Sequence, residues 1–496
     1  MLEAERSALL TLNVPFFTSP SDGTDLRDDT GISISSQGVS GVDRARARIR
    51  GLDPREIAWQ LTVIRQNMES FRGSAGISAG TVEPSPGSGD VIEPTREMFI
   101  AEADRVATEL ARYAIRRGTA AAWIALDWSS DSDTFELICL GHDLYNGVSG
   151  IALFFAAHAA VTGWTPSHEL ALAAVAHLRK ELRGHNAAPA ARALGLGGGS
   201  GLASIVYALA VMSKCLHDET LLADAQAVAA LITDDLIAAD KQLDVMGGSA
   251  GAILGLLRLY RDTRSGDVLD CATRCGEHLL AEPRVGPEGR RTWSRPNSGK
   301  ALNGMSHGAA GFAYALSSLA AATGRPDFAV AASECIAFEN SSYSREHHNW
   351  PDLRGDGGMH WPSQWCHGAP GIGLARIAIS KLPQADTATL TADVRNALQA
   401  VESGWSSHLR DTLCCGSLGS VEFLSEAGTA LGRPDLRELA ARQLAGIICA
   451  AASRGDYRWS ASSGRFNPGL FRGLAGVGYT ALRRVEDSLP DVLIWE

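Results

Sequence analysis

Glycine pairs recur along most of the chain, and this repeat constrains the fold more than any other feature of the sequence. Each pair has the form Gly-x-x-Gly and opens an apolar run with helical spacing, as in GIALFFAAHAAV and GFAYALSSLA. Successive pairs are 48 to 60 residues apart. The first glycines of the seven pairs are Gly147, Gly198, Gly248, Gly308, Gly368, Gly416 and Gly473. A repeat of this length is typical of folds that stack one supersecondary unit many times.

The segments between the apolar runs predict partner helices. Pro166 and Ser167 precede HELALAAVAHLRKEL, and GRPD occurs at 324–327 and 432–435. A proline in the first turn favours the start of a helix, so each repeat is predicted to be a helical hairpin. Counting a helix at about 97–117 as the first partner, seven hairpins give fourteen helices in two layers. The expected fold is all-α, an α/α toroid with a short N-terminal segment, and we assign the glycines to packing and turn geometry.

A stretch rich in Gly, Ser and Pro divides the chain at residues 71–95. This composition is typical of a solvated linker. The sequence therefore predicts an N-terminal segment (1–70), the linker (71–95) and a repeat domain (96–496). On its own, the N-terminal segment is too short to bury a sizeable core.

Charge and composition restrict the class of partner. The 496 residues carry a formal net charge of -11, which disfavours nucleic acid, because phosphate binding needs a basic surface. A cationic or neutral peptide fits better. The apolar runs at 151–161 and 202–212 are shorter than the roughly 18 to 20 residues that span a bilayer, and the acidic start does not resemble a secretory signal. We expect a cytoplasmic protein without membrane insertion, whose nine cysteines are reduced.

Three of the seven repeat heads carry residues capable of chemistry. They read SHG at 306–308, WCHG at 365–368 and LCCG at 413–416. In a closed toroid the inner helices all begin at one end, so these heads can converge although the sequence separates them widely. Three thiolates match the preference of zinc for sulfur, and an open fourth position would make the site catalytic rather than structural.

Buried cysteine also serves as a small hydrophobic residue, and this is the alternative reading for Cys414 and Cys415. We assign this role as a small hydrophobic residue to the cysteines in apolar or helical surroundings, which are Cys139, Cys215, Cys335 and Cys449. Cys271 and Cys275 are four residues apart on an expected helix, but no other ligand is near them in the sequence. They are expected to be core or surface residues.

Longer motifs surround these heads. They are LYNGVSGIALFF (144–155), SHGAAG (306–311), NWPDLR (349–354), WCHGAPGIGLAR (365–376), LCCGSLG (413–419), NPGLFRGLAGVGYTALRR (467–484) and the terminal LPDVLIWE. Together they resemble the cyclase domain of class II lanthipeptide synthetases, over about 97–496 and with all seven heads in order. SALLTLNVPFFT (7–18) and residues 60–70 are similar to the end of the kinase-like dehydratase domain that precedes the cyclase in that family. The resemblance implies an α/α toroid with one zinc ion at its mouth.

The resemblance also implies site residues. The zinc ligands fall on Cys366, Cys414 and Cys415, His307 matches a histidine implicated in acid-base chemistry, and Asp244 matches the corresponding acidic residue. Many relatives have Cys-His-Gly where this chain has CCG, so the site resembles a three-cysteine subgroup, in which three thiolates and Zn²⁺ sum to -1. The position of His367 is not a ligand in the matching motif. Some stand-alone cyclases have an arginine four residues before the first zinc cysteine, where this chain has a proline.

The implied activity is ring closure in a precursor peptide, in which cysteine thiols add to dehydroalanine or dehydrobutyrine. Asp244 could orient His307 or could simply cap a helix start. Rival interpretations are a zinc enzyme that adds a small thiol such as glutathione, and a non-catalytic scaffold that holds a precursor. Because no dehydratase machinery is expected in this chain, either a separate dehydratase supplies the modified peptide or the chain is a truncated synthetase.

Overall fold

The computed structural model describes residues 2–68 apart from 29, 37, 55, 58–59, 62 and 65–67, and residues 93–496 apart from 130–133, 283–289, 295–298, 355–359, 384, 406–409 and 460–466. The chain divides into two compact units, Met1–Met68 and Glu69–Glu496, which are described separately. The linker expected at 71–95 lies outside the described residues except for 93–95.

The first unit is small and mostly exposed. It contains α1 (Leu2–Leu10), an antiparallel hairpin of β1 (Asp25–Arg27) and β2 (Ser33–Ser36), and α2 (Gly41–Arg50). The Ser40 side chain accepts a hydrogen bond from the Asp43 amide and so caps α2. None of the side chains of α2 is buried, so this helix contributes no hydrophobic core to the unit.

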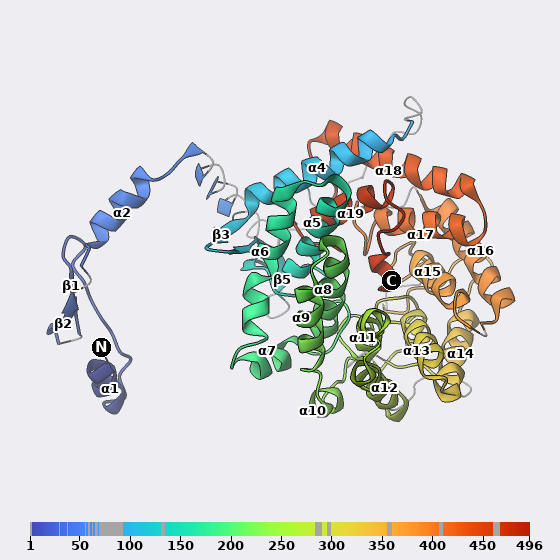
Figure 1. Cartoon of the computed structure of the whole chain (residues 1–496), viewed down its shortest axis with the longest axis horizontal. Coiled ribbons are helices and arrows are strands. Elements are labelled where there is room, and N and C mark those ends of the chain that lie inside the picture. Colours follow the sequence, from blue (N-terminus) through green and yellow to red (C-terminus); the bar gives the residue numbers. More distant parts are fainter. Residues whose placement is uncertain are drawn as a thin grey trace. The chain divides into compact units, whose positions relative to one another are not determined.

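Within its described residues, the second unit contains seven pairs of an inner and an outer helix (Figure 1), and six of these pairs are hairpins. The inner helices are α5 (Val148–Thr162), α8 (Leu202–Leu216), α11 (Ser249–Thr263), α13 (Ala309–Thr323), α15 (Ala369–Ser380), α17 (Ser417–Ala430) and α19 (Leu474–Arg483). Their outer partners are, in the same order, α6 (Thr165–Glu181), α9 (Glu219–Ala229), α12 (Gly266–Ala281), α14 (Pro326–Ser341), α16 (Thr387–Gly404), α18 (Pro434–Arg454) and α4 (Arg96–Tyr113).

The inner helices form a closed ring. Each one packs against the next, and α19 packs against α5, so the last repeat meets the first. The seventh pair joins α19 to α4, which comes from the start of the unit. The all-α toroid expected from the glycine repeat is therefore confirmed. Short helices α7 (Ala187–Leu194) and α10 (Asp234–Ala238) lie in connections, and none of the described helices could cross a lipid bilayer.

The helix expected at about 97–117 is too long, because α4 ends at Tyr113. Ala114 is extended, and the chain continues into two antiparallel hairpins that the sequence reading did not predict. They pair β3 (Ile115–Arg117) with β4 (Ala120–Ala122), and β5 (Ile124–Ser129) with β6 (Thr134–Cys139). Gly118, with a φ of 59°, lies in the first turn, and the buried Trp123 indole donates a hydrogen bond to the Leu110 carbonyl.

Turn geometry explains why glycines stand at the start of each repeat. In six repeats the first glycine is the residue before the inner helix, and the second lets the preceding loop fold back onto the helix. A Cβ at Gly371, for example, would collide with the carbonyl oxygen of Trp365. The repeat at Gly198 is out of register: Gly201 is the N-cap of α8, and Ser204 stands where the others have the second glycine. The Ser204 hydroxyl accepts a hydrogen bond from the Leu144 amide.

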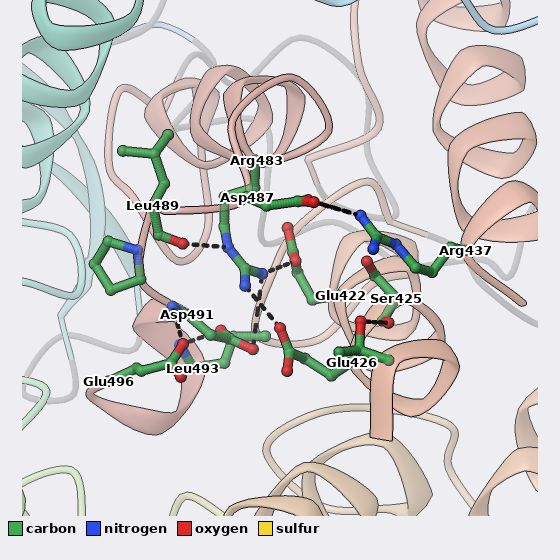
Figure 2. A network of polar contacts seen from close by, with 12 residues as sticks. Glu422, Ser425, Glu426, Arg437, Arg483, Asp487, Leu489, Asp491, Leu493 and Glu496 are labelled. Atoms are coloured by element: carbon green, nitrogen blue, oxygen red, sulfur yellow. Dashed lines mark hydrogen bonds and ion pairs between the residues drawn. The ribbon is translucent and has the colours of Figure 1, made fainter. Parts of the chain in front are cut away.

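The C-terminal segment fills the centre of the ring, where Figure 1 shows the end of the chain. The buried Trp495 indole donates to the Gly198 carbonyl, and the Trp365 indole donates to the Leu493 carbonyl. Figure 2 shows how Arg483 of α19 is held nearby: it pairs with Glu422 and Glu426 of α17, and its Nε donates to the Leu489 carbonyl. The tail thereby ties together helices from several repeats.

Candidate metal centre

A ring of backbone hydrogen bonds links the loops that precede the inner helices. The ring contains one residue from each repeat, the one two positions before the N-cap glycine. These residues are Tyr145, Gly199, Met246, Ser306, Cys366, Cys414 and Phe471. Among these described residues, each amide donates to the carbonyl of the next repeat over 2.9 to 3.3 Å, in six of the seven steps. This backbone ring makes Cys366 and Cys414 direct neighbours and closes from Phe471 to Tyr145.

Three cysteine side chains meet on this ring. Sγ of Cys415 lies 3.4 Å from Sγ of Cys366 and 3.1 Å from Sγ of Cys414. Cys366 and Cys414 are buried, and Cys415 is partly exposed. The structure thus brings together the three residues that the sequence predicted as metal ligands, and we call them the sulfur cluster.

The sulfur cluster fits a tetrahedral zinc ion. Its three ligand atoms lie within 4.8 Å of one another, and Zn–S bonds of about 2.3 Å place neighbouring sulfurs about 3.8 Å apart. Three protein ligands leave the fourth position for another donor, which is the arrangement of catalytic zinc. The surroundings of Cys415 also favour its thiolate form. Hydrogen bonds with Cys366 and then Cys414, together with the positive charges of Arg472 and Arg410, hold the pKa of Cys415 well below the usual thiol range.

His307 and Asp244 span the one step that the backbone ring lacks, between the α11 and α13 heads. Nδ1 of His307 lies 2.6 Å from Oδ2 of Asp244, although the two residues are 63 positions apart. The other oxygen of Asp244 accepts a hydrogen bond from the Gly247 amide. The carboxylate therefore both caps the turn and orients the imidazole, so the two readings of Asp244 are compatible. Although Nδ1 of His307 contacts Oδ2 of Asp244, the His307 side chain is still 23% exposed to solvent.

His367 lies between the two parts of the site. Its ring stacks on His307 with centroids 5.6 Å apart. Burial, and then the positive charges of Arg354 and His307, lower the pKa of His367 to about 3. A neutral imidazole packed in this way supports the His307 ring. Among the residues that the structure describes, the potential metal ligands that meet here are the three cysteines.

The sequence reading missed two residues beside the sulfur cluster. The Tyr145 hydroxyl donates to Sγ of Cys414 over 2.9 Å. Its signal was its register, because Tyr145 stands two residues before its glycine just as Cys366 and Cys414 do. Arg354 pairs with Asp352 and interacts electrostatically with Cys366 and Cys415. It supplies a positive charge near the thiols in a chain that has Pro362 at the arginine position of some cyclases.

Comparison with known proteins shows the family of the chain. The family model described as "Lanthionine synthetase C-like protein" matches residues 139–494, which is most of the chain. The chain belongs to the lanthionine synthetase C-like family. The matched region contains all seven inner helices and the sulfur cluster.

One solved structure with the same fold is nisin cyclase. Nisin cyclase matches with a TM-score of 0.51 and 16% sequence identity, over 78% of this chain and 92% of that chain. The Lin0763 protein from Listeria innocua gives a TM-score of 0.41 at 13% identity, over 57% of this chain and 83% of that chain. A search of curated protein sequences gives no match.

Proposed function

We propose that the protein is a zinc-dependent lanthionine cyclase acting on a dehydrated precursor peptide. The observation that carries the proposal is the sulfur cluster beside a carboxylate-oriented histidine, at the heads of a ring of helices in a chain of this family. The sequence motifs around the site resemble those of class II synthetases, and the N-terminal segment 1–70 would then be the end of a dehydratase domain.

The reaction joins a peptide thiol to an alkene. A new bond forms between the cysteine sulfur and the β-carbon of dehydroalanine or dehydrobutyrine, the carbon–carbon double bond becomes single, and the α-carbon takes a proton. The thiol proton leaves and a proton returns at carbon, so mass does not change. A zinc ion held by Cys366, Cys414 and Cys415 would supply Lewis acidity that lowers the pKa of the substrate thiol.

The protein's own residues would handle the proton and the charge. With Nδ1 of His307 held by Asp244, the imidazole is fixed in one orientation and can exchange a proton through Nε2. Asp244 would keep the imidazole in this orientation, because its carboxylate lies 2.6 Å from Nδ1. Arg354 adds a positive charge near the thiols, which favours the negative charge that develops on the enolate.

The experiment separates proton delivery from metal binding. A synthetic peptide with one cysteine and one dehydroalanine is given to the wild type and to His307→Ala, and loss of free thiol is followed by alkylation and mass spectrometry. We expect His307→Ala to keep its zinc and to lose roughly 10² to 10⁴ in rate, the usual worth of a positioned general acid. His168→Ala, at a histidine on the outer helix α6, is the matched control and should react like the wild type.

Two results would contradict this assignment. If the wild type closes rings no faster than they close in buffer alone, the proposed cyclase function is wrong. Loss of zinc from His307→Ala would make this histidine a ligand and the three-cysteine site wrong.

A further inference from the structure

A second group of potential metal ligands lies in the first helical hairpin. It consists of His142, in the loop before α5, and His177 and Glu181, in the last two turns of α6. Their ligand atoms all lie within 4.8 Å of one another. We call this group the outer cluster. It shares no residue with the sulfur cluster.

The geometry of the outer cluster suits a small cation. Nε2 of His142 lies 2.8 Å from Oε2 of Glu181, and Nδ1 of His177 lies 3.6 Å from the same oxygen. Ligands at about 2.0 to 2.1 Å from a tetrahedral zinc are about 3.3 Å from each other, so these separations need little adjustment. The two imidazole rings are stacked, with centroids 5.8 Å apart.

The backbone places the three residues close together before any metal binds. His177 and Glu181 are four residues apart on one helix, so they project from the same face. The carbonyl of His142 accepts a hydrogen bond from the Ser149 hydroxyl in the first turn of α5. The ligands therefore come from a packed hairpin, and little conformational entropy is lost when a metal binds.

The local charge favours a cation. Glu181 ends α6, where the unpaired carbonyls give the helix end a partial negative charge. Three basic residues are near Glu181 in the sequence: Arg179, Lys180 and Arg183. Two of them, Arg179 and Arg183, are paired with Asp224 of α9, which partly neutralises their charge.

We infer that His142, His177 and Glu181 form a second metal site, which takes a borderline divalent transition-metal ion such as Zn²⁺. Two imidazoles and one carboxylate form an established zinc ligand set that leaves a position for water. Since His142 is three residues from Tyr145, an ion bound here would brace the loop whose tyrosine contacts the sulfur cluster. The inference does not depend on the cyclase function.

Zinc counting on the full-length protein tests the inference. The protein is saturated with Zn²⁺, freed of unbound metal by gel filtration, and analysed for metal content. We expect two zinc ions per wild-type chain and one in a His177→Ala, Glu181→Gln variant. His177 is 71% exposed, so this variant should fold normally. His168→Ala, Glu169→Gln, on the same helix, is the matched control and should keep two.

A companion variant separates the two sites. The Cys414→Ala, Cys415→Ala variant should keep one zinc, bound by the outer cluster, and with Co²⁺ it should show only the weak visible bands of nitrogen and oxygen ligands. Equal zinc content in the wild type and the His177→Ala, Glu181→Gln variant would overturn the inference. So would a cysteine variant with intact helical circular dichroism that binds no metal.

Discussion

The sulfur cluster and the outer cluster lie near the same end of the α5 helix, but they are built in opposite ways. The sulfur cluster takes ligands from two repeats, 49 positions apart, and is largely buried on the backbone ring. The outer cluster takes its ligands from one hairpin and is partly exposed. One site therefore needs two repeats to pack against each other through α15 and α17, whereas the other needs only α5 and α6. We expect the first to be essential for chemistry and the second to affect stability alone.

The largest effect should follow from breaking the sulfur cluster. Cys366→Ala removes one of three ligands, and we expect ring closure to fall by more than roughly 100-fold, the upper end of what loss of an outer-shell group costs. Thiol alkylation of the model peptide measures it. Removing the exposed His177 serves as the parallel variant and should leave the rate unchanged. Equal losses in both variants would erase the proposed difference between the clusters.

A smaller effect is expected from the carboxylate behind His307. Asp244→Asn keeps an oxygen for the Gly247 amide but removes the negative charge beside Nδ1. Ring closure should slow roughly 10- to 100-fold while zinc stays bound, as for other groups that orient a catalytic side chain. Thiol alkylation of the model peptide measures the rate, and metal analysis measures the zinc. An unchanged rate would reduce Asp244 to a cap.

The third effect concerns Tyr145, which touches Cys414 from the loop that also carries His142. Tyr145→Phe removes one hydrogen bond to sulfur but keeps the ring stacked on Phe471. We expect roughly tenfold faster transfer of zinc to a chelator, in line with the cost of losing an outer-shell partner. If zinc transfer matches the wild type, the hydroxyl does not tune the metal centre.

The smallest effect should come from emptying the outer cluster. An ion that binds only the folded chain stabilises it, so saturating Zn²⁺ should raise the melting temperature of a Cys414→Ala, Cys415→Ala variant by a few degrees. Adding His177→Ala to that variant should abolish the increase, as followed by circular dichroism. A persistent increase would place the stabilising ion elsewhere.

The contrast also explains what the sequence could reveal. A repeat of glycines predicts hairpins, and a closed ring predicts that heads far apart in sequence converge, so Cys366 and Cys414 could be placed together without coordinates. The register of the second repeat could not be predicted from the sequence, because GGGSG contains several possible glycine pairs and only the packing shows that Gly201 is the cap. The hairpins after Tyr113 were missed because the helical pattern of α4 runs up to them without a proline or glycine break.

The outer cluster escaped prediction for a different reason. His177 and Glu181 have the spacing of an exposed helix face, which is usually just solvated, and His142 lies 35 to 39 positions earlier. Only the packing of α6 against α5 brings the three together. The sequence left open whether Asp244 orients His307 or only caps a helix start, because neither motif shows that one step of the backbone ring is left open for this pair.

Cobalt absorption tests the central claim most directly, because only sulfur ligands give an intense near-ultraviolet charge-transfer band. The protein with Co²⁺ in place of zinc should show this band, and it should strengthen when a peptide with a single cysteine adds a fourth sulfur. The Cys414→Ala, Cys415→Ala variant should lack it. A wild type without the band, or an undiminished band in the double variant, would contradict a metal centre at Cys366, Cys414 and Cys415.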